Sequence, residues 1–276
     1  MGILYLVATP IGNLEDISFR ALRILREAAL IAAEDTRRTR TLLDHFDIRA
    51  PLTSYFEHNK IQKMDRILEA LAEGDVALVS DAGTPLLNDP GYELVKAALK
   101  AGVDVRPVPG PSAPIAALTV SGLPVDSFLY LGYLPHKAGE RRKAAAEAAS
   151  LPHTLIFLET PHRIRDSLAD LLSALGERRI CVAREMTKLH EEYWRGNISG
   201  AIEYFKSKEP RGEFTLVVEG KHGGRLERWA RDVLASAVKE RLAEGKPAKQ
   251  ISAELAEISG WGRKEIYELI HRSGKG

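Results

Sequence analysis

The 276-residue chain is poor in several features that would assign its class at once. It has one cysteine, Cys181, which excludes an intramolecular disulfide framework and a cysteine-rich metal site and is typical of a reducing compartment. No run of 18 apolar residues occurs, and no basic residue precedes the apolar run at 3–9, so neither a membrane span nor an export signal is expected. The composition predicts a cytoplasmic globular protein.

Three common site motifs are also absent. The sequence contains no G-x-G-x-x-G, no G-x-x-x-x-G-K-[ST] and no H-E-x-x-H. A Rossmann dinucleotide site and a P-loop therefore lose their main support. Because the histidines are scattered rather than paired at ligand spacing, we predict no metal site.

Positive charge is not in excess over the whole chain, whose net charge is +1, but it is unevenly placed. Residues 221–276 carry 12 basic and 8 acidic side chains, a net charge of +4, whereas residues 1–220 have a net charge of −3. A basic tail of this size fits either a solvated helical surface or a nucleic-acid contact. Charge alone leaves both interpretations open.

Short apolar runs alternate with helical patterns along the first half of the chain. The runs lie at 3–9, 30–33, 76–80 and 103–108, and an amphipathic or apolar stretch follows each one. This alternation predicts a mainly parallel sheet with helices on both faces. Ligands bind beyond the carboxyl ends of such strands, so loops 9–16, 80–91 and 109–113 are the candidate binding loops.

A cluster of turn formers at 121–126 predicts a domain boundary. In the second half we expect strands at 128–134, 154–159, 179–185, 191–196 and 213–220, and helices near 139–149, 161–175 and 199–206. The link between the third and fourth of these strands is too short for a crossover helix, which predicts an antiparallel pair and a mixed sheet. The tail predicts three helices, at 225–243, 247–257 and 262–271. The expected domains are residues 1–122, 123–220 and 221–276.

Two of the loops have compositions suited to a ligand. Ser80–Gly91 combines carboxylates, hydroxyls and glycines directly after a buried strand, and 107–112 is stiffened by three prolines and a glycine. A rigid loop costs less ordering entropy when a ligand binds. The alternative for the first loop is an ordinary turn in which Asp89 caps the next helix.

Six segments in this order resemble the ribosomal RNA small subunit methyltransferase I family, the cytidine 2′-O-methyltransferases of the tetrapyrrole methylase superfamily. They are LVATPIGNLEDIS, AAEDTRRTRTLL, VSDAGTPLLNDPG, PVPGPSA, LETPHRI and REMTKLHEE, and the resemblance spans about residues 3–219. It implies an α/β protein with two αβα domains of the class III methyltransferase type and a C-terminal helical lobe. It also implies an S-adenosylmethionine-dependent homodimer that methylates a cytidine of 16S ribosomal RNA in the 30S particle.

The resemblance to this superfamily also implies a set of cofactor-binding residues. They are Pro10, Gly12, Asp81, Ala82, Gly83, Thr84, Ser112, Ala113, Leu158, Glu159, Thr215 and Leu216. For the group that accepts a proton, the ionisable segment 184–192 offers Glu185 and Lys188, and the end of the second strand offers Glu34 and Asp35. A solvated hairpin is the alternative interpretation of 184–192.

RNA contact is expected at the start of a helix beside the candidate loops, where Arg37, Arg38 and Arg40 could meet phosphates. Lys60 would add charge nearby, next to Tyr55 and Phe56, which are either stacking rings or core residues. The tail has the apolar spacing of a helix-turn-helix, but no DNA partner is expected. Two other functions stay open: a methyltransferase for a small tetrapyrrole, and a module that binds S-adenosylmethionine or RNA without catalysis.

Overall fold

The computed structural model describes residues 2–56, 60–221 and 229–273. The chain forms two compact units: Met1–Ala149 with His153–Glu219, and Ser150–Pro152 with Gly220–Gly276. The first unit holds two five-stranded sheets, one made from residues 3–108 and the other from residues 128–218. The division into domains at 122 and 220 stays a prediction.

The first sheet is entirely parallel, as the alternating pattern predicted. Its strands are β1 (Ile3–Val7), β2 (Leu30–Ala33), β3 (Leu52–Ser54), β4 (Val76–Val79) and β5 (Asp104–Val108), in the order β3-β2-β4-β1-β5. The connecting segments contain a 3-10 turn, η1 (Leu14–Asp16), and helices α1 (Phe19–Glu27), α2 (Thr36–His45), α3 (Lys60–Glu73) and α4 (Tyr92–Lys100).

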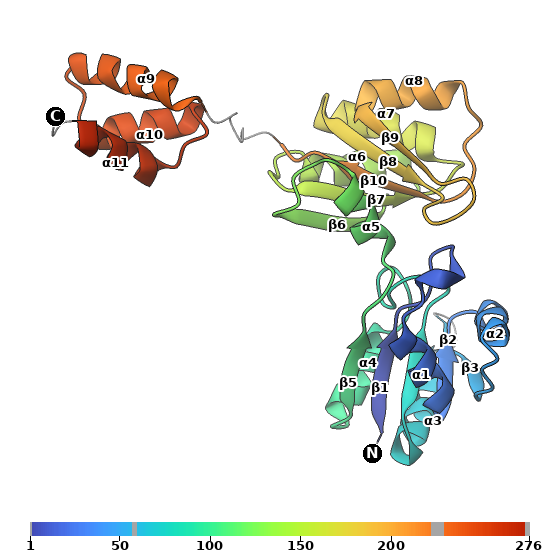
Figure 1. Ribbon diagram of the computed structural model, residues 1–276. Coiled ribbons are helices and arrows are strands. Elements are labelled where there is room, and N and C mark those ends of the chain that lie inside the picture. Colours follow the sequence, from blue (N-terminus) through green and yellow to red (C-terminus); the bar gives the residue numbers. More distant parts are fainter. Residues whose placement is uncertain (1, 57–59, 222–228, 274–276) are drawn as a thin grey trace. The chain divides into compact units, whose positions relative to one another are not determined.

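Both faces of this sheet are covered (Figure 1). On one face Val7 and Ile31 pack with Leu25 of α1 and Leu43 of α2. On the other face a separate cluster joins strand residues to α3 and α4; it includes Leu4, Leu78, Ile67, Leu71 and Leu94. Strands β2 and β4 are buried at every residue, as expected for central strands of a parallel sheet.

The second sheet is mixed, as predicted. It contains β6 (Phe128–Tyr133), β7 (Thr154–Glu159), β8 (Arg179–Arg184), β9 (Glu192–Asn197) and β10 (Phe214–Val218), in the order β6-β7-β10-β8-β9. Only the β6–β7 pair is parallel, and β8 and β9 form the expected antiparallel pair. The helices are α5 (Ala113–Val120), α6 (Ala138–Ala148), α7 (Ile164–Leu175) and α8 (Ile198–Lys206). Helix α7 begins three residues later than predicted because 161–163 form a turn.

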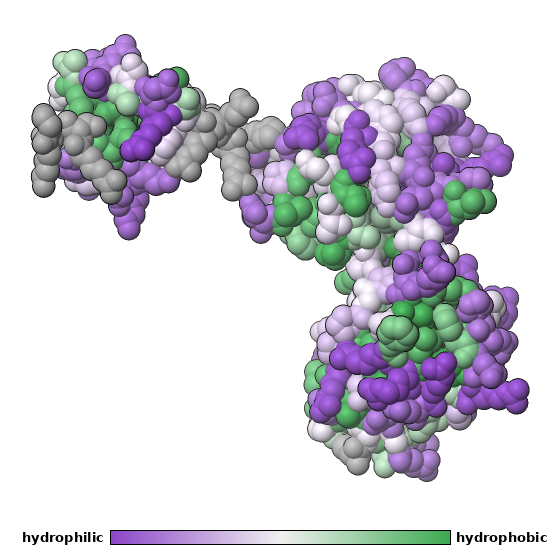
Figure 2. Space-filling view, in the orientation of Figure 1, coloured by the Kyte–Doolittle hydropathy of each residue, from purple (hydrophilic) through white to green (hydrophobic). Residues whose placement is uncertain are grey.

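The second unit is a small helical bundle of α9 (Arg231–Ala243), α10 (Ala248–Ile258) and α11 (Arg263–Ser273). It has its own core of Leu234, Val238, Ile251, Leu255 and Ile266. The predicted first helix is shorter than expected, and its residues 225–228 lie outside the described part of the chain. Its visible surface mixes hydrophilic and hydrophobic residues (Figure 2). Among the helices described here, none is long and apolar enough to cross a membrane.

Candidate functional site

A cavity of about 250 Å³ lies in the first unit, at the carboxyl ends of strands of the first sheet. The loops after β1, β2, β4 and β5, with Arg38 of α2, form one part of its wall. Residues in or next to β6, β7 and β10 and in the loop after β8 form the other part. Its lining residues are Ile11, Glu34, Arg38, Asp81, Ala82, Gly83, Thr84, Leu87, Asn88, Asp89, Ser112, Ala113, Pro114, Tyr130, Tyr133, Leu158, Met186, Glu213, Phe214 and Thr215. The location agrees with the general position of ligands in open α/β sheets.

Hydrogen bonds tie the three candidate loops to one another. Thr9 and Gly83 exchange two backbone hydrogen bonds of 2.9 Å, and Thr84 Oγ1 donates to the carbonyl of Pro111 at 3.0 Å. Gly83 has φ of +78°, and a Cβ atom there would stand 3.2 Å from Ile11 Cγ2. Glycine is therefore the residue that fits this crossing without strain, and the cavity wall is preorganised.

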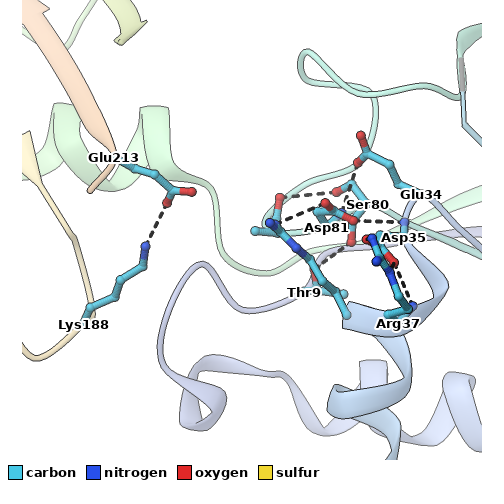
Figure 3. A network of polar contacts seen from close by, with 10 residues as sticks. Thr9, Glu34, Asp35, Arg37, Ser80, Asp81, Lys188 and Glu213 are labelled. Atoms are coloured by element: carbon cyan, nitrogen blue, oxygen red, sulfur yellow. Dashed lines mark hydrogen bonds and ion pairs between the residues drawn. The ribbon is translucent and has the colours of Figure 1, made fainter. Parts of the chain in front are cut away.

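Acidic side chains gather at the ends of β2 and β4 (Figure 3). Glu34 Oε2 accepts a hydrogen bond from the backbone N–H of Asp81 at 3.2 Å, and Asp81 Oδ1 accepts one from Asp35 N–H at 3.0 Å. Asp81 Oδ2 also lies 3.2 Å from Arg38 Nη1. Burial raises the pKa of Glu34, although the hydrogen bond from Asp81 opposes the rise.

Asp89 is the third carboxylate of this wall, and its pKa is raised to about 6. Burial is the main cause, and the negative charges of Glu34 and Asp81 add to it, while a hydrogen bond with the Ser80 side chain lowers it. Asp89 does not cap α4, because the N-cap position is Gly91 and no side chain bonds there. The alternative interpretation of this residue as a helix cap is therefore wrong.

Ser112 occupies the N-cap position of α5 without making a capping bond. Its hydroxyl oxygen is buried and has no hydrogen-bond partner within the part of the chain that the structure describes. A buried polar atom in that state costs free energy unless something pairs with it. Since Ser112 lines the cavity, a bound ligand can supply that partner.

Glu185 and Lys188 lie in the loop between β8 and β9 and do not line the cavity. Lys188 Nζ lies 2.9 Å from Glu185 Oε1 and 3.0 Å from Glu213 Oε2, and the second pair is drawn in Figure 3. Burial raises the pKa of Glu185, but bonds from Lys188 and from the backbone of Glu213 outweigh it and the net change is a lowering. The pKa of Lys188 is raised by the same pairs, against burial. These pairings favour the charged forms of both, although their catalytic role stays a prediction.

Asp35 has a structural task at the start of α2. Its carboxylate accepts the backbone N–H of Arg37 at 2.8 Å and pairs with the guanidinium of the same residue at 2.7 Å. Hydrogen bonds from the side chain and backbone of Arg37 lower the pKa of Asp35 to about 2. Asp35 therefore stays ionised as a helix cap.

The structure brings together eight of the twelve predicted cofactor-binding residues. The cavity is lined by Asp81, Ala82, Gly83, Thr84, Ser112, Ala113, Leu158 and Thr215. Pro10 borders a second cavity of about 140 Å³, which shares Arg38 and Asp81 with the first. Gly12 lies against Lys188, whose Cγ would stand 2.4 Å from a Cβ at Gly12.

The side chains of Glu159 and Leu216 do not reach the cavity. Leu216 is fully buried within the sheet. Glu159 is buried in a polar cluster in which its carboxylate accepts from Thr160 N–H, Arg163 Nε and Ser167 Oγ at 2.5 to 2.8 Å. Any part that these two positions play in binding a ligand stays a prediction.

The predicted RNA-binding residues divide into two groups. Arg38 lines the cavity through its pair with Asp81, whereas Arg37 and Arg40 are exposed on α2 outside it. Lys60 is the first residue of α3, and its side chain lies outside what the structure describes. Tyr55 is fully buried, so of its two interpretations the core position is correct.

Sequence reasoning missed much of the cavity wall. Asn88 and Asp89 lay within a loop already singled out, and Met186 lay within the segment REMTKLHEE, but Tyr130, Tyr133, Glu213 and Phe214 carried no motif signal. A glycine inside a predicted strand, Gly132, was a local signal of a close approach at this wall. In the structure its φ is +65°, and a side chain there would overlap Asn88. Within the described residues, no group of three or more His, Cys, Asp or Glu side chains is placed to hold a metal ion.

Comparison with known proteins shows the family to which this chain belongs. The family model described as tetrapyrrole (corrin/porphyrin) methylases matches residues 3–201. Uroporphyrin-III C-methyltransferase of Thermus thermophilus has the same fold, with a TM-score of 0.55 at 21% identity over 80% of this chain and 98% of that one. A second structure of that enzyme, complexed with S-adenosyl homocysteine, has a TM-score of 0.54 at 20% identity over 80% of this chain and 98% of that one.

Other known proteins are more similar to this chain in sequence than these two structures are. Ribosomal RNA small subunit methyltransferase I of Halalkalibacterium halodurans is 46% identical over 276 residues, which cover 98% of this chain and 95% of that protein. The protein of the same name from Escherichia coli O157:H7 is 46% identical over 271 residues, 97% of this chain and 94% of that one. The chain therefore belongs to the ribosomal RNA small subunit methyltransferase I family, within the tetrapyrrole methylases.

Proposed function

We propose that this protein is a methyltransferase that uses S-adenosylmethionine to methylate the ribose 2′-hydroxyl of a cytidine in 16S ribosomal RNA. We further propose that it acts in the cytoplasm, as a homodimer, on the assembled 30S particle. Near full-length similarity to proteins named ribosomal RNA small subunit methyltransferase I carries the proposal. The cavity at the strand ends supplies the place for the chemistry.

The residues of the cavity fit S-adenosylmethionine, which carries an ammonium and a sulfonium charge beside an apolar ring system. Four carboxylates line the cavity, those of Glu34, Asp81, Asp89 and Glu213. They outnumber the one cation among the lining residues, Arg38, and so favour a cationic ligand. Leu158 and Phe214 offer apolar surface for a base. The Ser112 hydroxyl, which has no hydrogen-bond partner among the described residues, and the backbone of 81–84 offer hydrogen bonds for the polar groups.

S-adenosylmethionine, when bound, supplies a methyl group already activated for attack by oxygen. The protein must then align the ribose hydroxyl with that carbon and accept its proton. Loops held by the Thr9–Gly83 and Thr84–Pro111 bonds provide a rigid frame for that alignment. Arg37 and Arg40 are exposed on α2, and in this proposal they bind RNA phosphates.

Transfer of a labelled methyl group tests this function directly. The purified protein is incubated with labelled S-adenosylmethionine and, in parallel, with 30S particles, free 16S RNA and a reduced tetrapyrrole. We expect label in the 30S sample, recovered as 2′-O-methylcytidine after nuclease digestion and mass spectrometry. Label at least as strong on free RNA would contradict the particle requirement. Label on the tetrapyrrole alone, or binding without transfer, would refute the proposed activity.

Two substitutions test the position of the cofactor. Asp81→Ala removes a carboxylate that joins the Asp35 backbone to Arg38, and Gly83→Val forces a branched side chain onto a left-handed backbone. We expect each to weaken S-adenosylmethionine binding at least tenfold by calorimetry, while circular dichroism shows a folded protein. If both variants bind as tightly as the parent, the cofactor lies elsewhere.

A further inference from the structure

The carboxylates of the cavity differ in the groups with which they already pair or form hydrogen bonds. Asp81 is held by Arg38 and by the backbone N–H of Asp35, and Glu34 is held by the backbone N–H of Asp81. Asp89 has neither a cation nor a backbone donor among the described residues; its hydrogen-bond partner is the Ser80 side chain. Glu213, the fourth carboxylate that lines the cavity, is paired with Lys188. Among the described residues, Asp89 is therefore the one of these four carboxylates with neither a cation nor a backbone N–H bound to it.

The backbone around Asp89 is held in an uncommon conformation. Leu86 and Asn88 have φ of +73° and +70°, in the left-handed region that residues other than glycine rarely adopt. Asn88 Oδ1 accepts a hydrogen bond of 2.5 Å from Tyr130 Oη, and its amide lies over Gly132 of β6. Such strain persists only where neighbouring structure enforces it. The contacts of Asn88 with Tyr130 and Gly132 therefore hold the segment next to Asp89 in place.

We propose that Asp89 is the proton acceptor of the methyl transfer, an assignment that rests on the proposed function. The 2′-hydroxyl loses its proton to an Asp89 carboxylate oxygen as the ribose oxygen bonds to the methyl carbon. The electron pair of the broken carbon–sulfur bond stays on sulfur, which becomes a neutral thioether. Asp89 then returns its proton to water, so charge and atoms balance.

The charged and titratable groups around Asp89 agree with this role. Glu34 and Asp81 end neighbouring strands, Arg38 lies on α2, Tyr130 and Tyr133 come from β6, and Glu213 precedes β10. Burial raises the pKa of Tyr130 to about 12, so that phenol stays neutral and accepts no proton. With its own pKa near 6, Asp89 is mostly ionised at neutral pH and is a stronger base than an exposed aspartate.

The variant Asp89→Asn tests the assignment, since it preserves shape and hydrogen bonding but accepts no proton. We expect turnover at saturating 30S particles and saturating S-adenosylmethionine to fall about 10²- to 10⁴-fold. The affinity for S-adenosylmethionine, measured by calorimetry, should fall by much less than the turnover, because Glu34, Asp81 and Glu213 remain in the cavity. Asp89→Glu should retain part of the turnover. The matched control is Asp65→Asn, on the exposed face of α3, which should match the parent.

Two readouts separate a base from a structural residue. The turnover of the parent should rise with pH through about 6, and this dependence should vanish in Asp89→Asn. Carbon-13 spectra of aspartate-labelled protein without cofactor should show one carboxyl signal that titrates near pH 6 and is missing in the variant. Turnover of Asp89→Asn within threefold of the parent, or loss of cofactor binding with the turnover, would overturn the assignment. A parent that transfers no methyl to RNA refutes the proposed function instead.

Discussion

At the scale of single residues, three carboxylates of this protein show how the partner decides the role. Asp35 has its pKa lowered by Arg37 and caps a helix. Glu159 is buried but paired with Arg163 and hydroxyl or amide donors. Asp89 is half-buried among other acids, and its pKa is raised. The same chemical group is thus a cap, a core ion pair or a base according to what surrounds it.

We expect the ionised Asp89 side chain to lower the free energy of unfolding at neutral pH. Its folded pKa of about 6 exceeds the ordinary 3.8, so the folded state favours the protonated form. The stability it contributes is complete below about pH 4 and is lost as pH rises through 6. An asparagine at this position would resemble the protonated form, so we expect Asp89→Asn to be more stable than the parent above pH 6.

The size of this gain can be bounded. A shift of two pKa units corresponds to about 3 kcal/mol, which partial exposure reduces to roughly 1 kcal/mol. Urea unfolding at pH 7.5 and at pH 4 measures the difference, which should shrink toward zero at the lower pH. If the variant is less stable than the parent at pH 7.5, then the ionised Asp89 side chain stabilises the folded loop, which contradicts this prediction.

In contrast to Asp89, the Glu159 carboxylate is expected to stabilise the folded protein. Removing its carboxylate leaves the largely buried guanidinium of Arg163 without its countercharge, and breaking one side of a buried ion pair costs about 3–5 kcal/mol. We expect Glu159→Ala to lower the unfolding free energy by that order, measured with urea, whereas Glu147→Ala, at an exposed position of α6, should change it little. Weaker S-adenosylmethionine binding at unchanged stability would instead support the ligand contact predicted from the sequence.

At the scale of elements, α2 connects the cavity with the surface beyond it. Asp35 caps it, Arg38 reaches the cavity through Asp81, and Arg37 and Arg40 are exposed to solvent. An expectation that all three arginines serve RNA alone is therefore too simple. Arg38 belongs to the wall of the cavity, and its loss should affect cofactor binding as well as RNA binding.

The exposed pair on α2 supplies a cleaner test. Arg37→Ala with Arg40→Ala removes two cations that could neutralise phosphates while it leaves Arg38 in place. We expect weaker RNA binding and unchanged S-adenosylmethionine affinity. The slope of log affinity against log salt should become smaller by about 0.7–0.9 for every phosphate that is no longer neutralised. Arg66→Ala on α3 is the control. An unchanged salt slope would mean that RNA passes elsewhere.

Elements also mark where sequence reasoning succeeds. The parallel sheet was predictable because its central strands are runs of four buried residues, each followed by a helix with an apolar stripe. Strand β3 escaped notice because Leu52–Ser54 is too short to carry a pattern. The second wall of the cavity was predictable only in part. The resemblance supplied Leu158 and Thr215, whereas Tyr130 and Phe214 are distant in sequence and meet only through tertiary packing.

At the scale of the whole molecule, the division into two compact units separates the main cavity from the basic tail. Every residue that lines the main cavity belongs to the first unit, and the bundle of α9, α10 and α11 has its own apolar core. The tail carries a net charge of +4, against −3 for the rest of the chain. The net positive charge is thus concentrated in the part of the chain that does not line the cavity.

We therefore expect that a chain without residues 222–276 keeps the fold of the first unit but binds RNA more weakly. We expect unchanged S-adenosylmethionine affinity, since the deletion removes no lining residue, and a larger fall in 30S affinity than in turnover at saturating 30S. Calorimetry with the cofactor and a filter-binding titration with 30S particles measure the two affinities.

A full-length variant with Lys239→Gln, Lys249→Gln and Lys264→Gln tests charge without deletion, because all three side chains are exposed. Its salt slope should fall by about 0.7–0.9 for each lysine that neutralises a phosphate in the parent. If the deletion abolishes cofactor binding, the tail supports the fold of the first unit. If the deletion weakens RNA binding but the lysine variant does not, shape rather than charge is what the tail contributes.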